Sequence, residues 1–484
     1  MTSFQYVVFG SDVLFALLLA GLGAGIAYAL RKEHLRRAWR TVFSGRMAMA
    51  SLAILLVYLS IAILDSFHYR PALQQKGDAP AAKVQYSVEV HTLLDALLSG
   101  LRDSREKSYS APLATHLYEK QMVEQPDGSQ KRERARLKFG GAHLTQAPAG
   151  WAGDVAARTA KGAVLGAALW LALTCVLALG VARAGKTTAA QALRAIFGGR
   201  TFIAWDGFVW ALLLVLLAAG VLATLSGGYH VFGTDATGND VLYQALKAIR
   251  VAILIGTLAT LVVLPFGIGL GLAAGYFGGR IDDAIQYIYT VISSIPYVLL
   301  IAAAALMMQM VIQQHADIFD TAAARADARL MSLCLIIGAI SWTTLCRLLR
   351  AETLKLRELD YVQAARCFGV SSVRIMLRHI LPNAFHIVLI TVVLDFSALV
   401  LAEAVLSYVG VGVDPTTISF GNMINTARGE LARDPVIWWS ITAAFVFMVM
   451  LVLSANLFAD AVREAFDPRG VTSLKRRLRM GAAR

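Results

Sequence analysis

Charged residues are scarce in this chain of 484 residues: Asp, Glu, Lys and Arg together make up 16% of it. Hydrophobic residues make up 57%, and the mean hydropathy of +0.60 is far from the average of soluble proteins. This composition excludes an ordinary soluble globular protein. The sequence therefore predicts an all-α, polytopic membrane protein.

Cysteine is also rare, and none of the four cysteines lies in the long polar segment 65–161; they are Cys175, Cys334, Cys346 and Cys367. No disulfide framework is indicated. The nine histidines show no metal-ligand spacing, and neither a catalytic triad nor paired acid–base carboxylates is indicated. We therefore expect no cofactor, no metal ion and no catalytic residue, and the chain is not expected to be an enzyme by itself.

One segment, Gly180–Thr187, fits the phosphate-loop pattern letter by letter. That chemistry needs a strand before the loop within a soluble α/β domain, whereas an apolar membrane segment precedes this one. We interpret it as the positively charged end of a loop and expect ATP hydrolysis to take place in another chain.

Apolar runs long enough to cross a membrane occur nine times, since a hydrocarbon core about 30 Å thick takes roughly 20 apolar residues. The predicted spans are 8–30, 47–64, 162–182, 207–226, 250–273, 286–312, 330–346, 384–406 and 437–458.

Lys and Arg are distributed unevenly between the loops. Twenty-five of the forty-five lie in 31–46, 183–200, 277–283, 347–379 and 459–484, whereas the opposite short loops hold six. The positive-inside rule therefore predicts a periplasmic N-terminus and a cytoplasmic C-terminus. This bias also explains the net charge of +13, so we expect the lipid bilayer and not nucleic acid as a partner. A cleaved signal peptide is not expected, because the first positive cluster follows the first apolar run.

A short polar helix-turn-helix lies between two long apolar segments, over residues 360–382. Asp360 is expected to cap the first helix, with Gln363 reaching back to it, and Gly369 suits a left-handed stop. Ser371 or Ser372 then restarts a helix that Pro382 ends. The adjacent Ala364 and Ala365 leave the first helix nearly bare of side chain, which allows another protein to approach its backbone.

This motif resembles the cytoplasmic EAA loop of permease subunits in ABC importers, particularly the dipeptide, oligopeptide and nickel branch. Further motifs of that branch follow in the same order: Gly233–Leu242, Gly275–Gly279 with Asp282, Leu406–Gly412, Phe420–Met423 and Asp460–Arg469. The resemblance covers roughly residues 205–470. One position departs from the family pattern, because Gln363 stands where Glu is usual, which puts any charge-dependent contact there in doubt.

The resemblance implies a permease of the bacterial inner membrane that pairs with a second permease subunit, two ATPase subunits and a periplasmic substrate-binding protein. It implies alternating access, in which closure of the ATPases moves the 360–382 loop. Coupling would then be carried by Asp360, Gln363, Ala364, Ala365, Gly369 and Pro382.

Five parts are predicted along the chain. They are two N-terminal helices (1–64), a periplasmic segment (65–161), an extra helix with an inner loop (162–204), the permease core (205–470) and a basic cytoplasmic tail (471–484). Either about 140 residues are inserted after a leading span that starts at Arg46, or residues 1–200 form an appended module. The segment 65–161 is either a solvated cap or a contact surface for the substrate-binding protein.

Ionisable residues within spans are expensive, at roughly 2.5 to 3.5 kcal/mol on insertion scales, and normally face protein or water. Asp395 and Glu403 lie eight residues apart on one predicted helix, so both can border a translocation pathway; alternatively Glu403 makes a structural hydrogen bond. Pro296 is expected to kink its span, which suits a helix bent around a pathway but also occurs for packing alone.

Two other function classes stay open. An ion-gradient-driven secondary transporter usually shows internal repeats with broken helices, and no convincing repeat is found. A membrane receptor using 65–161 as its sensor needs an inner signalling domain, yet only about 25 residues follow the last span. Nothing in the spans selects among peptides, nickel complexes and related solutes.

Overall fold

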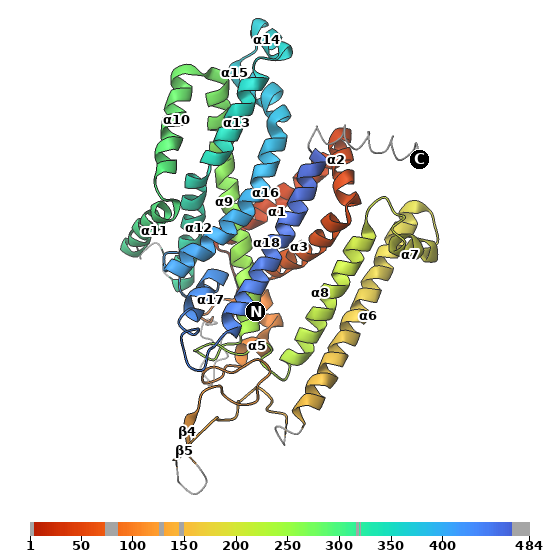
Figure 1. Ribbon diagram of the computed structural model, residues 1–484, viewed down its shortest axis with the longest axis vertical. Coiled ribbons are helices and arrows are strands. Elements are labelled where there is room, and N and C mark those ends of the chain that lie inside the picture. The colour runs from red at the N-terminus through yellow and green to blue at the C-terminus, as the bar shows by residue number, and fades with distance from the viewer. Residues whose placement is uncertain are drawn as a thin grey trace, which may run out of the picture. The chain divides into compact units, whose positions relative to one another are not determined.

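The computed structural model describes residues 4–72, 86–124, 130–144, 150–315, 319 and 321–466. They are predominantly helical (Figure 1). The first five helices are α1 (Gly10–Arg31), α2 (Glu33–Ser44), α3 (Arg46–Asp65), α4 (Leu93–Leu97) and α5 (Ser99–Asp103). The later helices are α6 (Trp151–Gly185), α7 (Ala189–Phe197), α8 (Trp205–Ser226), α9 (Val241–Phe277), α10 (Gly279–Ser294), α11 (Tyr297–Gln314), α12 (Ala322–Ser341), α13 (Thr343–Leu356), α14 (Asp360–Cys367), α15 (Ser372–Ile375), the π-helix η1 (Met376–Ile380), α16 (Leu381–Val409), α17 (Phe420–Ala427) and α18 (Trp439–Phe466).

Strands occur only outside the long helices within the described ranges. β1 (Phe4–Val7), β2 (His68–Pro71) and β3 (His91–Thr92) form an antiparallel sheet in that order. β4 (Gln121–Glu124) and β5 (Gln130–Glu133) form a separate antiparallel hairpin.

Nine helical stretches in the described residues are long and apolar enough to cross a membrane, as predicted. They are Gly10–Arg31, Arg46–Asp65, Trp151–Gly185, Trp205–Ser226, Val241–Phe277, Tyr297–Gln314, Ala322–Leu356, Ser372–Val409 and Trp439–Phe466. The all-α membrane fold is therefore confirmed. The four cysteines are free.

One predicted span, 286–312, is not a single kinked helix. The chain forms α10 and α11 instead, separated by Ile295 and Pro296. Ile295 is extended, with φ −88° and ψ 134°, because the ring of a following proline disfavours the helical conformation. Pro296 then caps the start of α11. The expected kink is thus a complete break, and only α11 belongs to a membrane-crossing stretch.

The chain divides into two compact units. Unit 1 comprises Met1–Val8, Phe43–Val251 and Ile418–Ser454, and unit 2 comprises Phe9–Val42, Ala252–Thr417 and Ala455–Arg484. These units interleave segments from distant parts of the chain, whereas the predicted parts follow chain order. The predicted basic tail, 471–484, lies outside the described residues.

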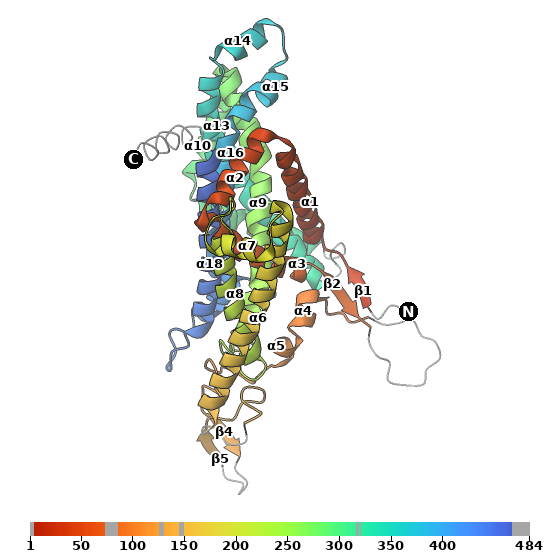
Figure 2. The ribbon, with the colours of Figure 1, turned by 90° about the vertical axis from the view of Figure 1, so that its right-hand side faces the viewer.

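Within unit 1, α6 and α8 pack side by side along much of their length, and both views show this pair (Figures 1 and 2). Their contact depends on glycine. A Cβ atom added at Gly162 would lie 2.5 Å from the carbonyl oxygen of Gly220, and one added at Gly166 would lie 2.4 Å from the carbonyl oxygen of Leu216. Small residues of this kind let two membrane helices approach backbone to backbone.

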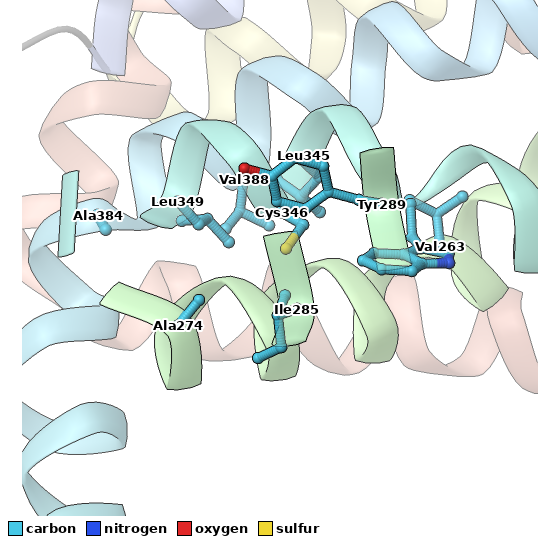
Figure 3. Close-up of a cluster of buried hydrophobic side chains, with 10 residues drawn as sticks. Val263, Ala274, Ile285, Tyr289, Leu345, Cys346, Leu349, Ala384 and Val388 are labelled. Atoms are coloured by element: carbon cyan, nitrogen blue, oxygen red, sulfur yellow. The ribbon is translucent and has the colours of Figure 1, made fainter. Parts of the chain in front are cut away.

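Within unit 2, one apolar cluster joins α9, α10, α13 and α16 (Figure 3). Its buried members are Val263, Ala274, Ile285, Tyr289, Trp342, Leu345, Cys346, Leu349, Ala384 and Val388. The first helix packs elsewhere in this unit, against α12, where the amide of Ser11 donates a 3.3 Å hydrogen bond to Asp327. The predicted coupling loop packs next to this four-helix cluster.

Candidate functional site

The predicted helix-turn-helix is present as α14, a turn at Gly369 and α15 (Figure 1). Gly369 has a φ of +74°, the left-handed conformation expected for a glycine stop. The amide of Val370 donates to the carbonyl of Ala365, and that of Gly369 to the carbonyl of Arg366. These two bonds occupy carbonyl groups that the end of α14 leaves free.

The predicted capping box at Asp360 is wrong. Leu359 is the N-cap, because its carbonyl accepts the first helical bonds, from the amides of Val362 and Gln363. Asp360 is consequently the first helical residue, where its charge favours the helix dipole. The side chain of Gln363 reaches Glu358 instead, at 3.4 Å.

The prediction that Pro382 ends the second helix is also wrong. Residues Ser372–Val409 form one continuous helical stretch, and Pro382 lies in the first turn of α16. The π-helical turn Met376–Ile380 directly precedes it. A π-turn shifts the hydrogen-bond register, so the absence of an N–H group at Pro382 costs the helix little hydrogen bonding.

The loop is packed onto the membrane helices of unit 2. Val362 of α14 and Ile375 of α15 are 2% and 0% exposed, and they cluster with Leu272 of α9. The side chain of Asn383 in α16 donates a 3.1 Å hydrogen bond to the hydroxyl of Tyr361. α14 is therefore packed against α9 and hydrogen-bonded to α16.

The outer face of the loop is bare. Gln363 and Ala364 are exposed and Ala365 is half-buried, as the pattern of small residues suggested. Sequence reasoning did not single out Phe368, whose side chain is 87% exposed beside the turn. A large aromatic residue next to the glycine stop was the available signal.

The helix that leads into the loop, α13, lies unusually close to α9. A Cβ atom at Gly271 would be 2.9 Å from the carbonyl oxygen of Cys346, and one at Gly275 would be 2.8 Å from that of Arg350. Arg357 at the end of α13 donates a 3.1 Å hydrogen bond to the carbonyl of Gly275. The Gly275–Gly279 motif thus holds two helices in direct backbone contact.

Pro296 borders a pocket of about 400 Å³ at the break between α10 and α11. Its lining comprises Ile292, Ser293, Ser294, Ile295, Pro296, Tyr297, Ile340 and Thr343. The hydroxyl of Tyr297 lies 3.2 Å from that of Ser341, where α12 gives way to α13. The break between α10 and α11 therefore lies beside the point where α12 continues through the helical Trp342 into α13.

The two acidic residues of α16 are in different surroundings. Glu403 is 1% exposed and accepts a 2.7 Å hydrogen bond from Ser407. Asp395 is half-buried, and among the described residues its Oδ2 atom has no hydrogen-bond partner. Asp395 is close enough to Tyr297 for an electrostatic interaction, so it lies near the pocket at the helix break.

Outside the membrane helices, the segment 86–144 is fixed to the loop between α8 and α9. Backbone hydrogen bonds join Glu106 N to Gly238 O, Leu113 N to His230 O, Thr234 N to Ser110 O and Gly141 N to Gly228 O, at 2.8 to 3.1 Å. Residues 228–238, which include the first part of the Gly233–Leu242 motif, therefore hold this segment in place.

A buried network of charged side chains adds to these backbone hydrogen bonds. His230 lies 2.7 Å from Asp240 through Nδ1 and 3.5 Å from Glu106 through Nε2, the latter an ion-pair distance. Burial disfavours the charged ring, but the bonds to Asp240 and Glu106 outweigh it and raise the pKa of His230 to about 9. Burial likewise opposes ionisation of Glu106, yet His230 and the amides of residues 138–140 lower its pKa to about 2.

Comparison with known proteins places these features in a family. Residues 267–470 match the family described as binding-protein-dependent transport system inner membrane component. The oligopeptide transport system permease protein OppC of Mycobacterium tuberculosis is 32% identical over 52% of this chain and 80% of its own length. That of Haemophilus influenzae is 30% identical over 50% and 71%, and the dipeptide permease protein DppC of Lactococcus lactis is 29% identical over 50% and 64%. The inward-facing MetNI methionine ABC transporter has a TM-score of 0.34 at 16% identity, over 46% of this chain and 97% of its own. The chain belongs to the inner membrane components of binding-protein-dependent transport systems, the permease subunits of ABC importers.

Proposed function

We propose that this permease subunit carries peptides or chemically related small solutes. The observation that carries the proposal is the 32% identity to an oligopeptide permease over 80% of that protein. The same family membership favours ATP-driven import over the two rival classes, an ion-gradient-driven transporter and a membrane receptor. ATP hydrolysis is assigned to a partner chain.

The 360–382 loop is proposed to dock an ATPase subunit. Its outer face supports docking, because the small Ala364 and the 87% exposed Phe368 are both accessible to a partner. The buried Val362 supports transmission of force into the spans. The full transporter would comprise a second permease subunit, two ATPase subunits and a periplasmic substrate-binding protein. Asp360, Gln363 and Ala365 belong to the proposed contact, whereas Pro382 serves to start α16.

The N-terminus is proposed to be periplasmic and the C-terminus cytoplasmic. The distribution of Lys and Arg supports this orientation, since the stretch 347–379 that contains the loop holds seven of them. The loop then faces the compartment in which ATP is available.

The translocation pathway is proposed to pass the pocket at Pro296 and the carboxylate of Asp395. The extended residue Ile295 interrupts the helix between α10 and α11 beside this pocket, and interrupted helices are typical of solute sites in transporters. The complete burial of Glu403 and its bond to Ser407 favour a structural role for that residue.

The test is purification of the tagged permease from gently solubilised membranes, followed by identification of co-purifying chains and an ATPase assay. We expect a second permease and an ATPase, and we expect Ala364→Trp to lose the ATPase. The matched control, Ala24→Trp, changes an exposed alanine of α1. A lone chain without ATPase activity would contradict the proposal, as would retention of the ATPase by Ala364→Trp.

A further inference from the structure

The β4–β5 hairpin rests on a fixed base at the outer side of unit 1. Glu119, just before β4, pairs with Arg433 at 3.2 Å, and the ring of Tyr118 lies 4.9 Å from that of Trp439 at the start of α18. The indole of Trp439 in turn donates a 3.0 Å hydrogen bond to the carbonyl of Thr234. The hairpin is therefore held at both the α9 and the α18 ends of the permease.

The two faces of the hairpin differ in charge. Residues alternate between faces along a strand, so Lys131 and Glu133 share one face, and they form a 2.6 Å ion pair there. Arg132 and Arg134 lie on the other face. In the strand register Arg132 is opposite Met122 and Gln121 is opposite Glu133. Lys120 directly precedes β4, and Arg134 directly follows β5.

This second face, formed by Lys120, Met122, Arg132 and Arg134, is called the basic face below. All four side chains are exposed, Met122 by 69%. No ion pair or hydrogen bond involves the three cations anywhere in the described part of the chain, and Glu119 is already engaged by Arg433. Alternation along β4 also places Glu124 on this face, so it combines three cations and one acidic residue around the methionine and is net positive.

The hairpin lies too far out to meet lipid. The 35 residues of α6 span about 50 Å, well beyond a hydrocarbon core of about 30 Å, and its predicted membrane part begins at residue 162. Both views place β4 and β5 beyond the Trp151 end of α6 (Figures 1 and 2). A partner for the basic face must therefore be soluble, and it must be acidic.

We propose that the basic face is a docking surface for an acidic, partly apolar patch on the soluble substrate-binding protein. The proposal rests on the proposed function, which supplies such a partner on this side of the membrane. Arg and Met are enriched in protein interfaces, and a charged surface accelerates encounter with an oppositely charged partner. Because its base contacts both α9 and α18, the hairpin ties the bound protein to the spans that move.

The test uses the assembled transporter in nanodiscs and the purified substrate-binding protein of the same system. We expect Arg132→Glu combined with Arg134→Glu to weaken the measured affinity about tenfold or more and to flatten its dependence on salt. Lys131→Glu is the matched control, since it makes the same kind of charge reversal on the same strand but on the opposite face. The affinity of this variant for the substrate-binding protein should stay within about twofold of the affinity of the unaltered transporter.

Three outcomes would overturn the proposal. The first is unchanged affinity and salt dependence in the Arg132 and Arg134 double variant. The second is an equal loss in Lys131→Glu, which would show a general field rather than a docking face. An affinity that follows the anionic lipid content of the nanodisc instead would also overturn it. Co-purification of the ATPase and basal ATP hydrolysis report on the proposed function separately, because neither depends on the hairpin.

Discussion

Arg350 of α13 holds Asp282 of α10 through two parallel contacts, Nε to Oδ1 at 2.5 Å and Nη2 to Oδ2 at 2.6 Å. This fork geometry is the strongest arrangement of a guanidinium and a carboxylate. The hydrogen bonds from Arg350 hold the pKa of Asp282 below its usual range, although burial opposes this. The helix that enters the coupling loop is thereby tied to α10, the helix that ends at the Pro296 break.

Asp282→Asn should therefore weaken both stability and coupling. Loss of a charged hydrogen-bond pair costs about 2 kcal/mol of unfolding free energy. We expect a lower thermal midpoint and reduced solute uptake per ATP hydrolysed in proteoliposomes. Asp283→Asn is the matched control, because Asp283 is the exposed neighbour on the same helix. The exchange Asp282→Arg with Arg350→Asp should restore part of the loss, and equal behaviour of the two Asn variants would contradict the role given to the pair.

Gly369→Val should uncouple transport while the protein still inserts into the membrane. A φ of +74° costs a residue with a side chain about 1–2 kcal/mol, and β-branched residues fit this conformation worst. We therefore expect α14 to shift from its packing position against α9. ATP hydrolysis should then no longer respond to the substrate-binding protein. Gly269→Val is the control, since that glycine is helical and has open space around it. Normal transport by the Gly369 variant would count against the loop assignment.

The His230 network predicts a loss of stability at alkaline pH. The pKa of His230 rises from 6.5 to about 9 on folding, so its contribution is complete below pH 6.5 and disappears as the pH rises through 9. Glu106, with its pKa lowered to about 2, contributes above pH 4.5 and is lost only in strong acid. The thermal midpoint should therefore fall between pH 6.5 and 9.5, by an amount equivalent to roughly 3 kcal/mol.

His230→Gln should be less stable at pH 7 and should lack this decline. His116→Gln is the control, because His116 is exposed. Parallel curves for the unaltered protein and the His230 variant between pH 6.5 and 9.5 would show that the charged ring contributes nothing to the fold.

Several features of the fold were predictable because they depend on local chemistry. Hydropathy averaged over a span is insensitive to neighbours, so the number of membrane-crossing stretches was correct. The left-handed turn at Gly369 was correct because few other residues accept a positive φ. Both signals are read from a short window of sequence.

The incorrect predictions concern places where tertiary contacts decide. The backbone turn that leaves α13 places the N-cap of α14 at Leu359, one residue before Asp360, and side-chain capping preferences do not reveal it. A π-turn lets a helix run through Pro382, although proline usually ends one. The contact of Glu106 with His230 joins residues more than a hundred positions apart, and no local pattern indicates it.

Asp395 and Glu403 give opposite predictions for the same chemical change. Asp395 is half-buried beside the pocket and its Oδ2 atom has no hydrogen-bond partner in the described residues, so it can attract a cationic group of a passing solute. Glu403 is fully buried and bonded to Ser407. Asp395→Asn should therefore reduce uptake of cationic solutes several-fold more than uptake of neutral ones, with little change in thermal stability.

Glu403→Gln should instead leave the preference between solutes unchanged and shift the thermal midpoint, because its hydrogen bond to Ser407 serves packing. The measurement is a competition of cationic and neutral dipeptides for uptake into proteoliposomes, with the thermal midpoint recorded for each variant. If Asp395→Asn keeps the preference of the unaltered protein, the carboxylate does not face the solute. The pathway must then be sought on other helices, since Asp395 would not take part in it.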